Sequence, residues 1–281
     1  MIVPRQADDV FIADVRRTMR RRTGVSLWWV GQSGFLVHYD GVCIAIDPYL
    51  SDSLTVKYAN TAKPHVRMTA RVVDPARLDM VSLVTSSHNH TDHLDAETIL
   101  PLWHANPQMH VACSAANVLF AAERLHVAST QLNGLVRGVP WQHGPFTLHV
   151  VPAAHNVREC DDAGHERFIG LVIEVGGVVI YHSGDTLHYD GMESLLRQWC
   201  IDIALLPING NDPARGVAGN LDGVAAAALA HAIGAHVVVP CHYNMFEFNT
   251  ADPAHFCAHA TALGQQYRLL QAGERLDIAP E

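Results

Sequence analysis

The sequence predicts a layered α/β fold. Short apolar runs bounded by Gly, Pro, Asn and Asp alternate with helical segments along the chain, an order that favours layered α/β architectures over all-β barrels. We find no internal repeat or low-complexity tract. A chain of 281 residues exceeds an average domain, but α/β folds of this length form one unit with a large core, so we predict a single domain over residues 1–281.

Residues 1–24 are predicted to form an N-terminal helical extension. Apolar residues at Val10, Phe11, Val15 and Met19 keep a helical spacing. The only dense basic run lies in the same segment, and we interpret it as the solvated face of this helix, with subunit contact or phosphate attraction as alternatives. This run consists of Arg16, Arg17, Arg20, Arg21 and Arg22.

The remaining elements follow in order. Buried strands are predicted just before Asp47, at residues 81–84, at 146–152, from 178 onward, and up to residue 239. Helices are predicted at residues 114–123, 192–199, 221–232 and 253–263, and the Ala-rich part of the third is expected to pack closely on a sheet. Polar stretches at 58–77 and 156–166 are predicted to be loops that either frame a pocket or cover plain surface.

The most informative motif follows the strand at 81–84. Within six residues the chain places His88, His90, Asp92 and His93. The end of a strand is a usual place for chemistry on a rigid scaffold. Because they alternate, His88 and His90 are able to face one ion while Asp92 and His93 face a second. Neutral imidazole and carboxylate ligands suit zinc, manganese or iron.

Three more candidate ligands each follow a later predicted strand: His155, Asp185 and His242. With the first cluster they make five His and two Asp, enough for two ions with a water or hydroxide between them. We interpret the other histidines as surface or hydrogen-bonded residues. His182 keeps an open alternative as a ligand, because it lies three positions from Asp185.

A His-x-His-x-Asp-His cluster followed by a lone His, a Gly-Asp-Thr and a late His resembles the ligand order of the metallo-β-lactamase superfamily. The resemblance implies two groups of three ligands joined by a bridging carboxylate. The first group is His88, His90 and His155, the second is Asp92, His93 and His242, and the bridge is Asp185. It also implies that Asp47 supports the metal loop from behind, and that the fold is a four-layered αββα sandwich with the metals at one edge of both sheets.

Within that superfamily, residues 29–36 and 46–53 resemble the L-ascorbate-6-phosphate lactonase family, as do residues 167–170, 181–186, 206–210 and 242–246. The resemblance implies opening of a phosphorylated sugar lactone, such as L-ascorbate 6-phosphate, by a metal-activated hydroxide. Asp92 or Asp185 is then expected to manage the proton. We expect two divalent ions, manganese or zinc with iron also possible for these ligands, and the resemblance favours manganese and a homo-oligomer.

Contacts to the substrate are less well defined by the sequence. Candidate anion contacts in or beside the polar loops are Lys57, Arg158, Arg167 and Arg215. An isolated base is otherwise a solvated or paired surface charge. Tyr243 and Asn244, next to His242, are candidate hydrogen-bonding partners of the substrate, or they bond to nearby backbone. Asn244 departs from the family pattern, where we expect an aspartate.

Three alternative functions remain open at this point. The nearest is another hydrolase on the same metals: a phosphodiesterase, a thioesterase or a broad lactonase. The second is a diiron oxygen reductase, which replaces the second histidine of the cluster by glutamate, whereas this chain has His90. The third is a non-catalytic metal-binding module, which the full set of seven ligands disfavours.

Composition agrees with a cytoplasmic enzyme that acts on a small molecule. The net charge of −9 argues against nucleic-acid binding, and no apolar run approaches the roughly 18 to 20 residues of a membrane span. The N-terminus lacks the apolar region of a signal peptide. The six cysteines show no paired short spacing, so we expect free thiols, with Cys241 packed inward beside His242.

Overall fold

The computed structural model describes residues 1–212 and 219–278. Arg215, one of the predicted anion contacts, lies outside the described residues. Two seven-stranded mixed sheets form the centre of the molecule.

The first sheet runs in the order β14-β1-β2-β3-β4-β5-β6, with an antiparallel half and a parallel half. Its strands are β1 (Val25–Gly31), β2 (Gly34–Tyr39), β3 (Val42–Ile46), β4 (Val81–Ser86), β5 (His110–Ser114), β6 (Leu132–Leu135) and β14 (Arg275–Ile278). β1 is buried along its whole length, as expected for a strand covered on both faces.

The second sheet runs in the order β13-β12-β11-β10-β9-β8-β7. Its strands are β7 (Trp141–His143), β8 (Phe146–Pro152), β9 (Ile169–Val175), β10 (Val178–His182), β11 (Ile203–Pro207), β12 (Val237–Cys241) and β13 (Gln266–Tyr267). Strands β10 to β13 are parallel, and β7 to β10 are antiparallel.

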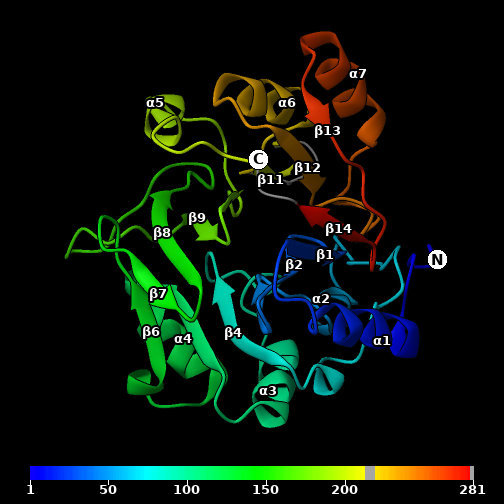
Figure 1. The fold of residues 1–281 in the computed structure, drawn as a ribbon, viewed down its shortest axis with the longest axis vertical. Helices are drawn as coiled ribbons and strands as arrows, with labels where there is room; N and C mark the ends of the chain where they lie inside the picture. The colour runs from blue at the N-terminus through cyan, green and yellow to red at the C-terminus, as the bar shows by residue number, and fades with distance from the viewer. Residues whose placement is uncertain (213–218, 279–281) are drawn as a thin grey trace.

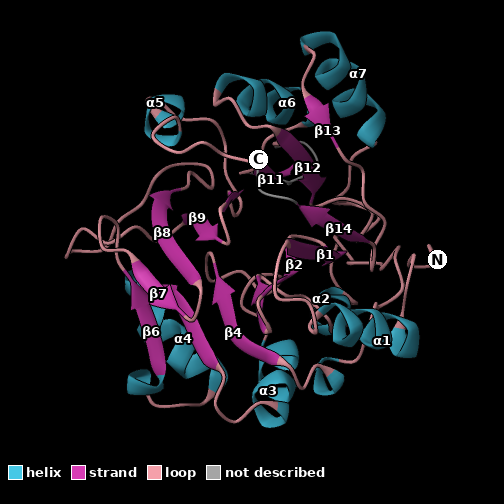
Figure 2. Cartoon of the chain, in the orientation of Figure 1, coloured by secondary structure: helices cyan, strands magenta, loops and turns pink. Residues whose placement is uncertain are grey.

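Helices cover the outer face of each sheet (Figures 1 and 2). The helices are α1 (Asp8–Thr18), α2 (Ser53–Tyr58), α3 (Ala96–Ala105), α4 (Val118–Leu125), α5 (Met192–Leu196), α6 (Gly223–Ala232) and α7 (Pro253–Leu263), with short 3₁₀ turns at Pro75–Arg77, Ala115–Asn117 and Ser129–Gln131. Residues of α1, α3 and α4 share a core with the first sheet, whereas α5, α6 and α7 contribute to the core of the second.

The space between the sheets is filled by apolar side chains from both, among them Trp29, Phe35, Phe146 and Ile180. Layers therefore run helix, sheet, sheet, helix, which confirms the predicted four-layered αββα sandwich. The alanines of α6 pack closely as expected, since Ala226, Ala227 and Ala230 are buried. None of the described helices combines the length and apolar character that crossing a bilayer needs.

The N-terminal extension docks on the first sheet through α1. Phe11 and Val15 are fully buried, and the buried carboxylate of Asp14 accepts hydrogen bonds from Trp28 Nε1 at 3.0 Å and from Arg275 at 2.7 Å. Four of the five arginines of the basic run form ion pairs: Arg16 with Asp79, Arg17 with Asp14, Arg21 with Asp277, and Arg22 with Asp40. This supports their interpretation as a solvated, paired face.

Helix α3 is absent from the helices predicted by the sequence. Pro101 lies in its interior, where proline removes a backbone donor and usually breaks a helix. The helix persists because Ile99 and Leu102 are fully buried against the first sheet, and because Asp95 caps its N-terminus. The predicted helix at 114–123 begins instead as a 3₁₀ turn and becomes α4 only at Val118.

Candidate metal centre

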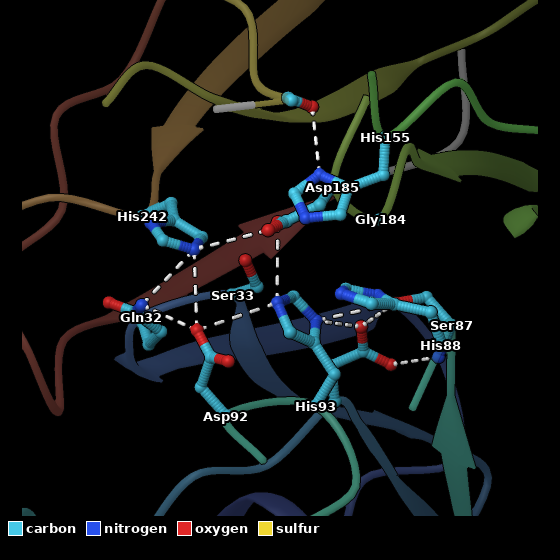
Figure 3. Close-up of polar contacts among 12 residues, drawn as sticks. Gln32, Ser33, Ser87, His88, Asp92, His93, His155, Gly184, Asp185 and His242 are labelled. Carbon is cyan, nitrogen blue, oxygen red and sulfur yellow. Dashed lines mark hydrogen bonds and ion pairs between the residues drawn. The ribbon is translucent and has the colours of Figure 1, made fainter. Parts of the chain in front are cut away.

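The seven predicted ligands meet where strands of both sheets end. The loop after β4 carries His88, His90, Asp92 and His93, while His155 follows β8, Asp185 follows β10, and His242 follows β12. Figure 3 shows His93 of the first sheet's loop facing Asp185 and His242 of the second sheet. The site therefore lies at the common edge of the sheets, as the sequence predicted.

Ligand atoms of these residues form three groups, in each of which all atoms lie within 4.8 Å of one another. The groups are His88, His90 and His155; Asp92, His93 and His242; and His88, His93 and Asp185. The first two match the predicted groups. Asp185 lies between them, with Oδ1 3.3 Å from His93 Nε2 and Oδ2 3.4 Å from His242 Nε2.

Asp47 supports the loop from behind, as predicted. His93 Nδ1 donates to Asp47 Oδ2 at 2.6 Å, so its Nε2 is left facing the other ligands. The same carboxylate accepts from Ser87 through the backbone N at 2.9 Å and through the hydroxyl. Asp47 itself has φ of 42°, a left-handed conformation that is uncommon for a non-glycine residue and recurs at functional sites.

His155 and His182 differ in what their two ring nitrogens contact. His155 Nδ1 donates to the carbonyl of Gly219 at 3.1 Å, which leaves Nε2 for the site. His182 uses both nitrogens: Nε2 donates to Ser33 O at 2.9 Å, and Nδ1 accepts from Gly184 N at 3.2 Å. His182 is therefore a structural residue that holds the loop before Asp185, and its alternative as a ligand is wrong.

Burial lowers the pKa of His88 well below its usual value, and the neighbouring His93 lowers it further. Burial also lowers the pKa of His90, although Asp92 opposes this. Both imidazoles are therefore neutral near pH 7, the form in which histidine binds metals.

Around the second group the charges are opposite in sign and coupled. Burial disfavours the charged form of both carboxyls. Even so, His242 and His93 hold the pKa of Asp185 well below its usual range, and His93 also holds the pKa of Asp92 well below its usual range. In turn, and again against burial, Asp185 and Asp92 raise the pKa of His93 well above its usual value and that of His242 to about 9. These carboxylates thus stabilise the protonated, positively charged forms of His93 and His242.

Three buried ligand atoms make no hydrogen bond with the described residues, although the last two face each other as an ion pair at 3.3 Å: His88 Nε2, His93 Nε2 and Asp185 Oδ1. An unpaired buried polar atom is costly, and three that converge on one point fit a cation better than a packed core. The donor set of imidazoles and carboxylates is also the set that zinc, manganese and iron accept. The residues present therefore fit two divalent metals.

A cavity of about 400 Å³ opens over these residues. Its base includes His90, Asp92, His155, Asp185 and His242. Its walls come from the α2 region, the predicted 58–77 loop, helix α4 and the segment after β12, and they include Lys57, Lys63, His65, Arg124, Phe246 and Phe248. The polar stretch at 58–77 thus frames the pocket, whereas only Asn156 of the 156–166 stretch reaches it.

Of the predicted substrate contacts within the described residues, only Lys57 lines the cavity. Arg158 lies outside this lining and pairs with the buried Glu166 at 2.6 Å. Arg167 is exposed away from the cavity.

Tyr243 and Asn244 also lie outside the cavity lining. Tyr243 is buried and stacks on Trp29 with 5.0 Å between ring centroids. The backbone of Asn244 bonds to Thr250 and Thr69, so this segment is held by local contacts. Cys241 packs into the core as predicted.

The sequence did not assign three residues that the structure places at the site. Lys63 and Arg124 line the cavity, and Gln32 contacts Asp92 and His242. Lys63 has a signal in the sequence, since Lys57 and Lys63 are the only two lysines of the chain. Gln32 lies in the stretch 29–36 that carries the family resemblance, but neither it nor Arg124 belongs to a ligand motif.

Comparison with known proteins agrees with this geometry. A family model for the β-lactamase superfamily domain matches residues 43–243. The chain is also 32% identical over 207 residues to a UPF0173 metal-dependent hydrolase of Methanosphaerula palustris, with 70% of this chain and 84% of the relative covered. The chain belongs to the metallo-β-lactamase superfamily, among its UPF0173 metal-dependent hydrolases.

Two further relatives cover the hydrolase almost completely. A UPF0173 metal-dependent hydrolase of Caldivirga maquilingensis is 28% identical, with 90% of this chain and 97% of the relative covered. Among solved structures, the metallo hydrolase Igni18 of Ignicoccus hospitalis is 26% identical and superposes with a TM-score of 0.66, covering 91% of this chain and 99% of that one. The family and the αββα fold thus agree.

Proposed function

We propose that this hydrolase opens the lactone ring of a small anionic substrate, most specifically a phosphorylated sugar lactone such as L-ascorbate 6-phosphate. The observation that carries the proposal is the cavity, which joins two metal-ligand groups at its base to the only two lysines of the chain at its wall. Its volume of about 400 Å³ suits a small molecule.

His88, His90 and His155 would hold one cation, Asp92, His93 and His242 the other, and Asp185 would bridge them. When bound, two divalent cations lower the pKa of a water molecule and polarise an ester carbonyl. We propose manganese as the native metal, and the same ligands accept zinc or iron.

Asp92 and Asp185 are the groups that we propose for proton transfer. Both remain carboxylates at neutral pH, because the histidines beside them lower their pKa values against the effect of burial. Both line the cavity. No described residue donates a hydrogen bond to Asp92 Oδ1, so this is the oxygen that we propose to accept a proton from the attacking water.

Lys57 and Lys63 supply the proposed anion contact. Both side chains are exposed, and neither forms an ion pair with another described residue. The carboxylates of Asp92 and Asp185 line the same cavity, so two lysines at its mouth offset the negative charge that an incoming phosphate meets. Tyr58, His65, Phe246 and Phe248 form an aromatic wall beside them, with His65 stacked on Tyr58 at 4.3 Å between ring centroids. Such a wall suits the face of a ring.

The test is turnover of L-ascorbate 6-phosphate by metal-free protein reconstituted separately with manganese and with zinc, followed by loss of the enediol absorbance. Asp185→Asn is the control variant. Metal-dependent turnover that the control lacks supports the proposal and names the working metal. If the protein binds two metals but does not hydrolyse L-ascorbate 6-phosphate, the proposed substrate is wrong. Assays with other lactones, thioesters and phosphodiesters then identify the class of substrate.

A second readout uses the two lysines directly. An amine-selective acetylating reagent can modify only Lys57, Lys63 and the N-terminal amine, so mass spectrometry reads each site separately. We expect L-ascorbate 6-phosphate to protect both lysines while the N-terminus is modified at an unchanged rate. Equal modification with and without the substrate contradicts the proposed anion contact.

A further inference from the structure

Gln32 lies in the tight connection between β1 and β2, at the wall of the second metal group (Figure 3). It is fully buried, and its φ of 51° places it in the left-handed region. Its carbonyl accepts from His242 N and from Trp29 Nε1, both at 2.9 Å. These bonds tie the β1–β2 connection to the loop of His242, and they explain how a strained backbone is kept at this position.

The side chain of Gln32 reaches two ligand atoms of the second group. Nε2 donates to Asp92 Oδ2 at 2.8 Å and lies 3.1 Å from His242 Nε2. At the other end of the carboxamide, Oε1 is buried and has no hydrogen-bond partner among the described residues. The present orientation therefore satisfies Asp92 and leaves one buried acceptor unpaired, which costs free energy.

With a cation held by Asp92, His93 and His242, the oxygen Oε1 of Gln32 suits the site better than the nitrogen Nε2. The N–H groups of Nε2 repel a cation, whereas a carboxamide oxygen is an accepted ligand of hard divalent metals. The two ends of the group are nearly equal in size, so a half turn about the last side-chain bond exchanges them without moving the backbone. No hydrogen bond of Oε1 is lost in that turn.

We propose that Gln32 is an additional ligand of the second metal group and offers Oε1 to the cation. The inference rests on the proposed dinuclear function, and it extends the ligand set beyond the seven residues of the sequence motif. A neutral oxygen ligand raises the coordination number and hardness of this group, which favours manganese over zinc there.

The alternative role is that of a donor that holds Asp92 in place through Nε2. The two roles predict opposite effects of Gln32→Glu. If Gln32 is a ligand, a carboxylate at this position adds negative charge beside the cation and tightens the second group. If it is only a donor, the new carboxylate has no N–H to offer Asp92 Oδ2, so the bond that orients this ligand is lost and the second group weakens.

The experiment titrates the metal-free full-length protein with Mn²⁺, followed by electron paramagnetic resonance, and with Co²⁺, followed by visible absorption. It compares the wild type with Gln32→Leu, Gln32→Glu and the matched control Gln142→Leu, an exposed glutamine away from the site. We expect Gln32→Leu to weaken the second cation about 10- to 100-fold, Gln32→Glu to tighten it about tenfold, and the first cation to be unchanged in both.

Weaker binding of the second cation by Gln32→Glu, or unchanged binding by Gln32→Leu, overturns the proposal. If Gln32→Leu does not fold, Gln32→Glu decides, since it has nearly the shape of the natural side chain. A wild type that binds fewer than two cations contradicts the proposed function itself. If the wild type binds two cations and the Gln32 variants bind the second cation with the wild-type affinity, only the role of Gln32 is contradicted.

Discussion

The two metal-ligand groups differ in charge and in burial. The first group consists of three histidines, and His90 is exposed to the cavity. The second lies deeper, with His93 and His242 buried and Asp92, Asp185 and Asp47 around them. The first group thus contains no carboxylate and has one ligand open to the cavity, whereas the second combines buried histidines with carboxylates that raise the pKa values of those histidines. Binding at the second group must displace the protons of those histidines.

The largest expected effect comes from the residue that joins the groups. Asp185→Asn removes the charge shared by His93 and His242, so we expect turnover to fall at least about 100-fold while the fold is kept. Steady-state kinetics with metal analysis checks this, and circular dichroism controls for folding. Unchanged turnover in a variant that binds both metals shows that Asp185 does not act as the bridge.

Asp47 holds His93, a ligand of the second group, and its replacement should therefore affect the two groups differently. Asp47→Asn leaves one oxygen for the three donors that the carboxylate serves, His93 Nδ1 and the N and Oγ of Ser87, so the ring of His93 is held less firmly with Nε2 toward the site. We expect affinity for the second cation to fall about 10- to 100-fold, with the first nearly unchanged. Calorimetric titration measures both, with the exposed Asp190→Asn as control. An equal loss at both groups contradicts the separation.

The proton content of the groups predicts different pH dependences. A histidine must be neutral to bind a metal, and the carboxylates raise the pKa of His242 to about 9, against the effect of burial. Below that pH, binding displaces a proton from His242, and the raised pKa of His93 adds a second, so affinity for the second cation should rise at least about tenfold per unit between pH 6 and 8. Affinity for the first should change less, because burial lowers the pKa of His88. Titrations at several pH values compare the slopes, and equal slopes refute the distinction.

The smallest expected effect lies at the mouth of the cavity. Lys57→Ala and Lys63→Ala each remove one exposed charge, so we expect KM for a phosphorylated lactone to rise about 3- to 10-fold with kcat nearly unchanged. An uncharged lactone serves as the matched control, since its KM should stay the same. A fall in kcat for both substrates instead places the lysines in the chemistry rather than in anion binding.

The sequence predicted the ligands because their motif is local and each follows its own strand. It missed Gln32, since that role exists only where the β1–β2 connection meets the loop of His242, more than two hundred residues later. The ion pair of Arg158 escaped the sequence analysis for the same reason, because its partner Glu166 becomes buried only in the folded chain. Helix α3 was missed because tertiary packing overrides the local effect of Pro101.

The most direct test of the account is the number of metals per chain, measured together with hydrolysis. Metal-free protein is loaded with increasing Mn²⁺, bound metal is counted after desalting, and turnover of L-ascorbate 6-phosphate is followed at each step. The account predicts two ions per chain, with full turnover only when both are bound. Saturation at one ion per chain, or full turnover with a single ion, would contradict it.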